Sequence, residues 1–195
     1  MAVKYFKGSD LLSMRWPIYK AKHALQTSGV IVYPTETVWG LGCDPTDSEA
    51  LDRILDIKRR DADKGLILVA ADIDQFEFLL SDLTESQRAE LDKNWPGPFT
   101  YLVPHNGKVN PLVHGRFDTV AIRVSSHPMV QELCEQFAGP IVSTSANYAG
   151  QPTVRSAVQA RMLFGSEVDY VLSGDVGLSA PSRIIDLQSG RVLRN

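Results

Sequence analysis

Short apolar runs of strand length recur along this chain and alternate with segments that carry a helical period. The run from Gly29 to Tyr33 is rich in valine and isoleucine and ends at Pro34, which is typical of a buried strand that leads into a loop. Several connections are short enough for hairpins, so we expect a mixed sheet rather than a purely parallel one. Further strands are predicted at residues 65–71, 99–103, 119–124 and 169–172. Another strand is expected to begin at Ile141, and the segments RIIDL and RVLRN are expected to form a final pair of strands.

Helical stripes of apolar residues fill the intervals between these runs. Two capping boxes, Thr46 with Glu49 and Thr84 with Gln87, mark expected helix starts. The chain has no internal repeat and no linker long enough to separate two units, so we expect a single α/β sheet domain over residues 1–195. One helix is expected to begin at Pro17. Further helices are expected over residues 47–58, from Thr84 to before Trp95, from Pro128 to near Gly139 and around residues 154–164.

Charge and cysteine usage narrow the class of protein. A net charge of -3 and a pI near 5.8 argue against a protein that is basic throughout and coats nucleic acid non-specifically. Cys43 and Cys134 provide neither a disulfide framework nor a zinc site, and we expect both to be buried. With no signal sequence and no apolar run near ~18 residues, the chain is expected to be a soluble, cytoplasmic protein without a membrane partner.

Lys58, Arg59 and Arg60, followed by Lys64, form the first cluster with chemical potential. On the predicted helix Lys58 continues the apolar stripe, so its side chain should leave on the buried side. A buried ammonium is costly unless it is paired or faces an anion. If the helix ends at Lys58, an extended segment would aim Lys58 and Arg60 at one site. The alternative is a solvated cationic helix end that complements the helix dipole.

The segment Ser143-Thr144-Ser145-Ala146-Asn147 follows the strand that opens at Ile141. Its alternate residues Ser143, Ser145 and Asn147 would present two hydroxyls and an amide together at a strand end, where ligands bind in α/β sheets. The alternative is a turn in which serine and asparagine bond their own backbone.

Arg123 lies in the middle of the strand predicted at residues 119–124, on the same face as Thr119 and Ala121. The planar guanidinium matches a carboxylate or phosphate in two parallel hydrogen bonds, so we place it against an anionic substrate. The alternative is an edge-strand arginine that faces water.

Several common site motifs do not occur. The chain has no P-loop signature, no dinucleotide-binding glycine pattern and no H-E-x-x-H. Its four histidines stand apart, and no Ser-His-Asp motif supports nucleophilic catalysis.

Six motifs in order resemble the YrdC/TsaC family of L-threonylcarbamoyladenylate synthases, over nearly the whole chain from about Ile18. Lys58 and Arg60 fit the family's Lys-x-Arg pattern, and Ser145 and Asn147 fit its Ser-x-Asn pattern. Asp61 and Lys64 stand where many relatives of the family carry proline and asparagine. The six motifs are YPTETVWGLGCDP, KRR, DKGLILVA, WPGPFT, AIRVSSHP and STSAN.

The resemblance implies a twisted open mixed α/β sheet with flanking helices and a concave cationic cleft. It also implies a reaction that joins L-threonine, bicarbonate and ATP, with Mg²⁺, into threonylcarbamoyl-AMP and pyrophosphate. The product supplies the threonylcarbamoyl group for tRNA modification, so separate tRNA-modifying transferase proteins are expected partners.

Site roles follow from the same resemblance. Lys58 and Arg60 are expected to be catalytic, and Thr35, Arg123 and Ser145 are expected to bind L-threonine. The residues expected to bind nucleotide are Lys58, Arg60, Lys64, Thr119, Ser143, Asn147, Thr153 and Arg194. No residue is assigned as a metal ligand.

Two rival functions remain open. The first is an RNA-binding module that uses the same basic concave surface, because residues 53–64 carry five basic and three acidic side chains. Weak RNA contact is also expected as a secondary property of the enzyme. The second rival is a small-molecule binder that kept the fold and lost the chemistry.

Overall fold

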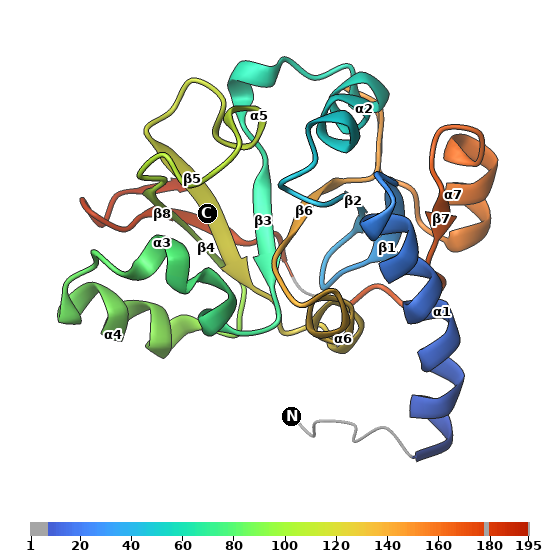
Figure 1. Ribbon diagram of the computed structural model, residues 1–195, viewed down its shortest axis with the longest axis horizontal. Coiled ribbons are helices and arrows are strands. Elements are labelled where there is room, and N and C mark those ends of the chain that lie inside the picture. The colour runs from blue at the N-terminus through green and yellow to red at the C-terminus, as the bar shows by residue number, and fades with distance from the viewer. Residues whose placement is uncertain (1–7, 178–179, 195) are drawn as a thin grey trace.

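A computed structural model of the chain describes residues 8–177 and 180–194 (Figure 1). The helices are α1 (Gly8–Gln26), α2 (Ser48–Lys58), α3 (Glu77–Leu80), α4 (Glu85–Asn94), α5 (Pro111–His114), α6 (Pro128–Phe137) and α7 (Ala157–Phe164), with 3-10 turns at Ala62–Lys64 and Ile73–Phe76. The strands are β1 (Ile31–Pro34), β2 (Trp39–Gly42), β3 (Ile67–Ala70), β4 (Phe99–Pro104), β5 (Thr119–Val124), β6 (Ile141–Ser145), β7 (Tyr170–Val171), β8 (Arg183–Asp186) and β9 (Val192–Arg194).

The strands form one sheet in the order β7-β1-β2-β6-β3-β5-β4-β8-β9. The pairs β1–β7, β3–β5 and β4–β8 are parallel, and the remaining pairs are antiparallel. In Figure 1, α1 and α7 lie at the β7 side of the molecule and α3 and α4 lie at the β8 side, with β3 and β5 between them. The predicted mixed sheet is therefore confirmed.

Alternation along β5 separates the core from an open face. Val120, Ile122 and Val124 are buried in the larger apolar cluster, whereas Thr119 and Arg123 line a pocket on the other face. The division into two faces follows the period of two that the sequence carries in this strand. It explains how one strand supplies both core and site.

The strand β2 was not predicted, because the sequence indicated a loop after Pro34. Gly40 and Gly42 lie within β2, which pairs with β1 on one side and β6 on the other. A Cβ at Gly42 would meet the Val142 carbonyl oxygen at 2.6 Å and Tyr33 Cε1 at 2.7 Å. Glycine is needed here because neighbouring groups approach the backbone closely.

The structure confirms some of the predicted helix starts and contradicts others. The capping box of Thr84 and Gln87 is confirmed. The box at Thr46 is wrong, because the Asp47 carboxylate accepts from the amides of residues 49 and 50 and caps α2. The expected start at Pro17 is also wrong, since α1 begins at Gly8 and Pro17 lies inside it. Among the described helices, none has the length and apolar character needed to cross a membrane.

Candidate functional site

A pocket of about 590 Å³ opens on the face of the sheet that carries Arg123. The β1–β2 loop, the segment after α2, the central strands and the C-terminal hairpin all contribute to its lining. Among the residues that the structure describes, four lysine and arginine side chains and His114 line the pocket, and no aspartate or glutamate does. Eight of the predicted site residues are in the lining: Thr35, Arg60, Lys64, Thr119, Arg123, Ser143, Ser145 and Arg194.

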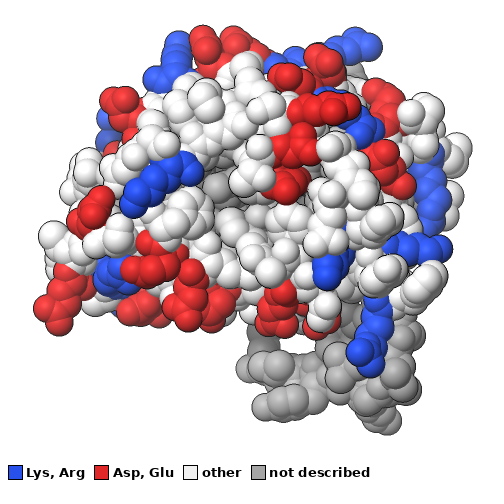
Figure 2. Space-filling view, in the orientation of Figure 1, with Lys and Arg blue, Asp and Glu red and all other residues white. Residues whose placement is uncertain are grey.

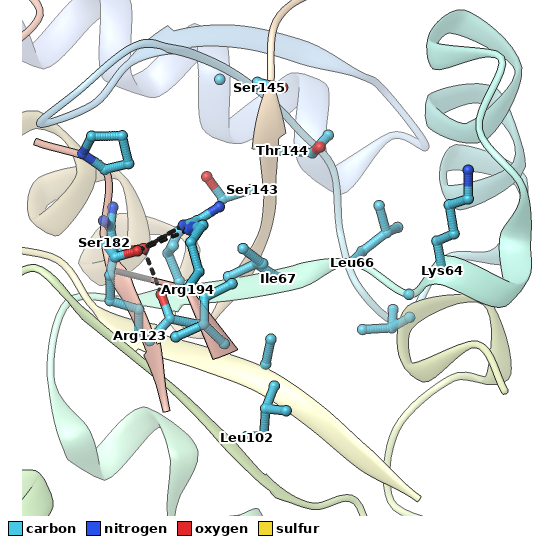
Figure 3. A pocket seen from close by; sticks show the side chains of 18 of the residues that line it. Lys64, Leu66, Ile67, Leu102, Arg123, Ser143, Thr144, Ser145, Ser182 and Arg194 are labelled. Atoms are coloured by element: carbon cyan, nitrogen blue, oxygen red, sulfur yellow. Dashed lines mark hydrogen bonds between the residues drawn. The ribbon is translucent and has the colours of Figure 1, made fainter. Parts of the chain in front are cut away.

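The basic residues form two groups within the pocket. Figure 3 shows Lys64 at one side, and Arg123 and Arg194 gathered with Ser182 at the other. Lys58, Asn147 and Thr153 are outside the lining. The pocket therefore offers two separated places for anionic groups.

Lys58 lies behind the pocket wall and is only 5% exposed. Its ammonium donates to the carbonyl oxygens of Ser145 and Asn147 and to Asn147 Oδ1, the last at 3.1 Å. Burial, with a further contribution from the charge of Arg60, lowers the pKa of Lys58 to about 8. The predicted buried orientation is confirmed, and the alternative of a solvated helix end is wrong for this lysine.

Arg60 follows the end of α2, which stops at Lys58 because Arg59 adopts a left-handed backbone with φ of 48°. The Arg60 Nη2 donates to the carbonyl oxygen of Gly65 at 2.9 Å, and its buried Nε has no partner among the described residues. Partial burial lowers the pKa of Arg60. The guanidinium is thus held in the pocket wall by backbone oxygens, and no carboxylate of the described residues pairs with it.

Of the three residues at the end of β6 that were expected to face one site, two line the pocket and one does not. Ser143 and Ser145 line the pocket, but the Asn147 amide donates to the backbone oxygens of Tyr148 and Gln151. The alternation ends because β6 stops at Ser145. The alternative of a turn that bonds its own backbone is therefore correct for Asn147, whose Oδ1 also accepts from Ser145 Oγ at 2.6 Å.

Arg123 is 8% exposed and pairs with Glu36, Nη2 to Oε2 at 2.7 Å. The alternative of an edge-strand arginine is wrong, because β5 lies between β3 and β4. Burial by itself would raise the pKa of Glu36, but Arg123 and the Ser125 hydroxyl lower it further than burial raises it. The Nη2 of Arg123 is therefore already bonded to Glu36, while the buried Nε of Arg123 has no partner among the described residues.

Arg194 and Ser182 lie beside Arg123, at the side of the pocket opposite Lys64 (Figure 3). The Arg194 Nη2 donates to the Ser182 carbonyl oxygen at 2.8 Å, and the Ser182 and Thr100 hydroxyls are 2.9 Å apart. Partial burial, together with the charge of Arg123, lowers the pKa of Arg194. Sequence reasoning missed Ser182 because no motif or period marks a serine that precedes the short strand β8.

Thr35 lies in the β1–β2 loop and is 6% exposed. Its Oγ1 donates to the Val38 carbonyl oxygen at 2.7 Å, so the hydroxyl also holds the loop together. Phe117 and Leu193 add an exposed apolar part of the lining that was not predicted. An isolated aromatic residue in a loop gives no sequence signal for a pocket.

Similarity to known proteins extends over almost the whole chain. The Sua5/YciO/YrdC family model, described as telomere recombination, matches residues 23–195. A protein of Chromohalobacter salexigens named threonylcarbamoyl-AMP synthase is 50% identical over 177 residues, which cover 91% of this chain and 96% of that protein. A protein of Saccharophagus degradans with the same name is 51% identical and is covered to 90%, with 87% of this chain.

Solved structures share the fold. The P. abyssi Sua5 structure complexed with L-threonine has a TM-score of 0.83 and 32% identity over 91% of this chain. This chain spans 52% of the P. abyssi protein. The E. coli YciO structure has a TM-score of 0.80 and 27% identity, with 93% of this chain and 89% of that one covered.

Proposed function

The chain belongs to the Sua5/YciO/YrdC family, and from this premise we propose that it is an L-threonylcarbamoyladenylate synthase. The enzyme joins L-threonine, bicarbonate and ATP to give threonylcarbamoyl-AMP, pyrophosphate and water, the water being released when the threonine amine and bicarbonate form the carbamate. The observation that supports this function most directly is a pocket whose described lining holds four lysine and arginine side chains and several hydroxyls, and no acidic residue. Such a lining suits a triphosphate beside a small hydroxy amino acid.

The chemistry calls for charge stabilisation more than for a covalent intermediate. A threonine carbamate oxygen attacks the α-phosphorus while pyrophosphate leaves, so negative charge develops along the line of displacement. Arg60 and Lys64 are assigned to the triphosphate on one side of the pocket. Lys58 lies behind the pocket wall, where its ammonium donates to Ser145 and Asn147, and is assigned to adding positive charge near the line of displacement.

The other side of the pocket is assigned to L-threonine. Thr35, Arg123 and Ser145 face the substrate. The hydroxyl of Thr35 is the group that selects the hydroxyl-bearing side chain of threonine over side chains that lack a hydroxyl. Thr119, Ser143 and Arg194 belong to the nucleotide subsite. Asn147 and Thr153 lie outside the pocket lining, and we assign them to the nucleotide subsite as residues next to it.

Mg²⁺ enters with ATP as part of the substrate in this proposal. None of the described lining residues carries a side-chain carboxylate, and the nearby Glu36 is engaged by Arg123 and Ser125. Because Mg²⁺ prefers phosphate and carboxylate oxygens, the triphosphate is the better ligand for it here. Partners of the enzyme are the transferase proteins that consume threonylcarbamoyl-AMP during tRNA modification.

RNA binding is the less favoured function. Of the basic residues in 53–64, Arg53 forms an ion pair, Lys58 is buried and Arg60 bonds backbone oxygens. Only Arg59 and Lys64 of this set are exposed. On the face shown in Figure 2, acidic side chains gather over α2 and over α3 and α4, which opposes a phosphate backbone on that face.

Pyrophosphate release tests the proposal. Release should require L-threonine and bicarbonate together, and a pure binding protein would release none. Thr35→Val should raise the KM for L-threonine about tenfold, because a buried hydroxyl partner is lost, and should leave the KM for ATP unchanged. Equal effects on both constants would remove Thr35 from the threonine subsite.

A further inference from the structure

Glu36 is a buried carboxylate at the centre of a network that no predicted role uses. Its Oε2 accepts from Arg123 Nη2 at 2.7 Å, and its Oε1 accepts from Ser125 Oγ at 2.7 Å and from the Ser126 amide at 2.9 Å. The side chain of Glu36 is 9% exposed. A carboxylate buried with three donors is fixed in one place.

The backbone of Glu36 is held as firmly as its side chain. A Cβ at Gly177 would meet the Glu36 carbonyl oxygen at 2.5 Å, so the segment before β8 packs closely on this residue. The Gly177 amide donates to the Thr35 carbonyl oxygen at 2.9 Å, and the Thr37 hydroxyl donates to the Ala180 carbonyl oxygen at 3.2 Å. Glu36 thus joins the β1–β2 loop to the end of β5 beneath the segment that precedes β8.

We propose that Glu36 is a positioning residue of the L-threonine subsite, which fixes the Arg123 guanidinium and the Thr35 loop at a constant spacing. This inference rests on the proposed function, since it assigns Arg123 and Thr35 to L-threonine. Glu36 is outside the pocket lining and acts only through its neighbours.

The charge of Glu36 is needed as well as its shape. Arg123 and Arg194 lie close enough for the charge of Arg123 to lower the pKa of Arg194. Glu36 is the carboxylate that pairs with Arg123. Without the charge of Glu36, Arg123 loses its ionic partner among the described residues, the repulsion between the two guanidinium groups is no longer offset, and Arg123 is held less firmly. Lys64, which is assigned to the triphosphate, lies at the opposite side of the pocket, whereas Arg194, which is assigned to the nucleotide subsite, lies beside Arg123 (Figure 3).

Glu36→Gln is the direct test, because it keeps the side-chain shape and removes the charge. The initial rate of pyrophosphate release is measured against L-threonine and against ATP. Losing one charge-assisted anchor should raise the KM for L-threonine about tenfold. We expect kcat to stay within about twofold of the wild type, and the KM for ATP to rise by at most about threefold, because Arg60 and Lys64 remain in place at the triphosphate. Glu77→Gln is the matched control, since Glu77 forms an exposed pair with Arg88 on α3 and α4 and should change neither constant.

Ser125→Ala provides a second, milder variant if Glu36→Gln does not fold. It removes the bond from Ser125 Oγ at 2.7 Å and keeps the Arg123 pair. It should raise the KM for L-threonine about threefold and spare ATP. The inference is overturned if either folded variant raises both KM values equally, lowers kcat alone, or behaves as wild type. A wild-type chain that releases no threonine-dependent pyrophosphate would instead refute the proposed function.

Discussion

Raising the pH should strengthen the fold and weaken ATP binding through the same residue, Lys58. Burial lowers the pKa of this lysine from 10.5 to about 8, with a contribution from the charge of Arg60. Between these two pH values the unfolded chain binds more protons than the native chain, so the free energy of unfolding rises with pH. Below pH 8 the cost of the buried ammonium is fully present.

The size of each effect follows from the lowered pKa and from the contacts of Lys58. The shift corresponds to about 3 kcal/mol without solvent screening, and to about 1 to 2 kcal/mol once water in the adjacent pocket screens the charge. ATP binding should move in the other direction, because an ammonium that loses its proton no longer attracts the triphosphate. Between pH 7 and pH 9.5 we expect ATP affinity to fall by about tenfold.

The assay compares the wild type with Lys58→Met at several pH values. Calorimetry without L-threonine gives the ATP affinity, and urea denaturation gives the free energy of unfolding. Both pH trends should flatten in Lys58→Met and persist in Lys93→Met, a matched change at an exposed lysine of α4. The reasoning is refuted if the wild type and Lys58→Met show the same pH dependence of unfolding. It is also refuted if wild-type ATP affinity stays constant over this range.

Three further changes test other parts of the structure. Arg60→Ala should lower kcat for pyrophosphate release about 100-fold, because a preorganised cation at the developing charge is lost, with an unchanged circular dichroism spectrum. Gly42→Ala should lower the free energy of unfolding by about 2 kcal/mol, measured by urea denaturation, because the added Cβ would lie 2.7 Å from Tyr33 Cε1. Burial raises the pKa values of Cys43 and Cys134, so neither thiol should react with a disulfide reagent before the chain unfolds in urea.

Much of the fold was predictable because its signals are local. Strand β5 matches the predicted range, and the Thr84 capping box starts α4 as expected. The strand β2 was missed because Gly40 and Gly42 resemble loop residues until β1 and β6 lie on either side of them.

The candidate site was predictable in the residue types and less so in their connections. Thr35, Arg123 and Ser143 line the pocket as the motifs implied. The Asn147 amide instead bonds its own loop, because β6 ends two residues earlier. Ser182 was missed because it lines the pocket only once the C-terminal hairpin has packed against the rest of the sheet.

The sequence alone determined the alternation of strands and helices, the face of β5 that carries Arg123 and the motifs that indicate the family. Side-chain period and capping are properties of neighbouring residues, so they can be read without the fold. The tertiary structure decided which charges meet. Glu36 reaches Arg123 across 87 positions of the chain, and Lys58 reaches Ser145 across another 87, because the strand order brings these segments together. Whether a lysine or an arginine is free or bonded depends on that order, since ion pairs form between groups that are close in space and not in sequence.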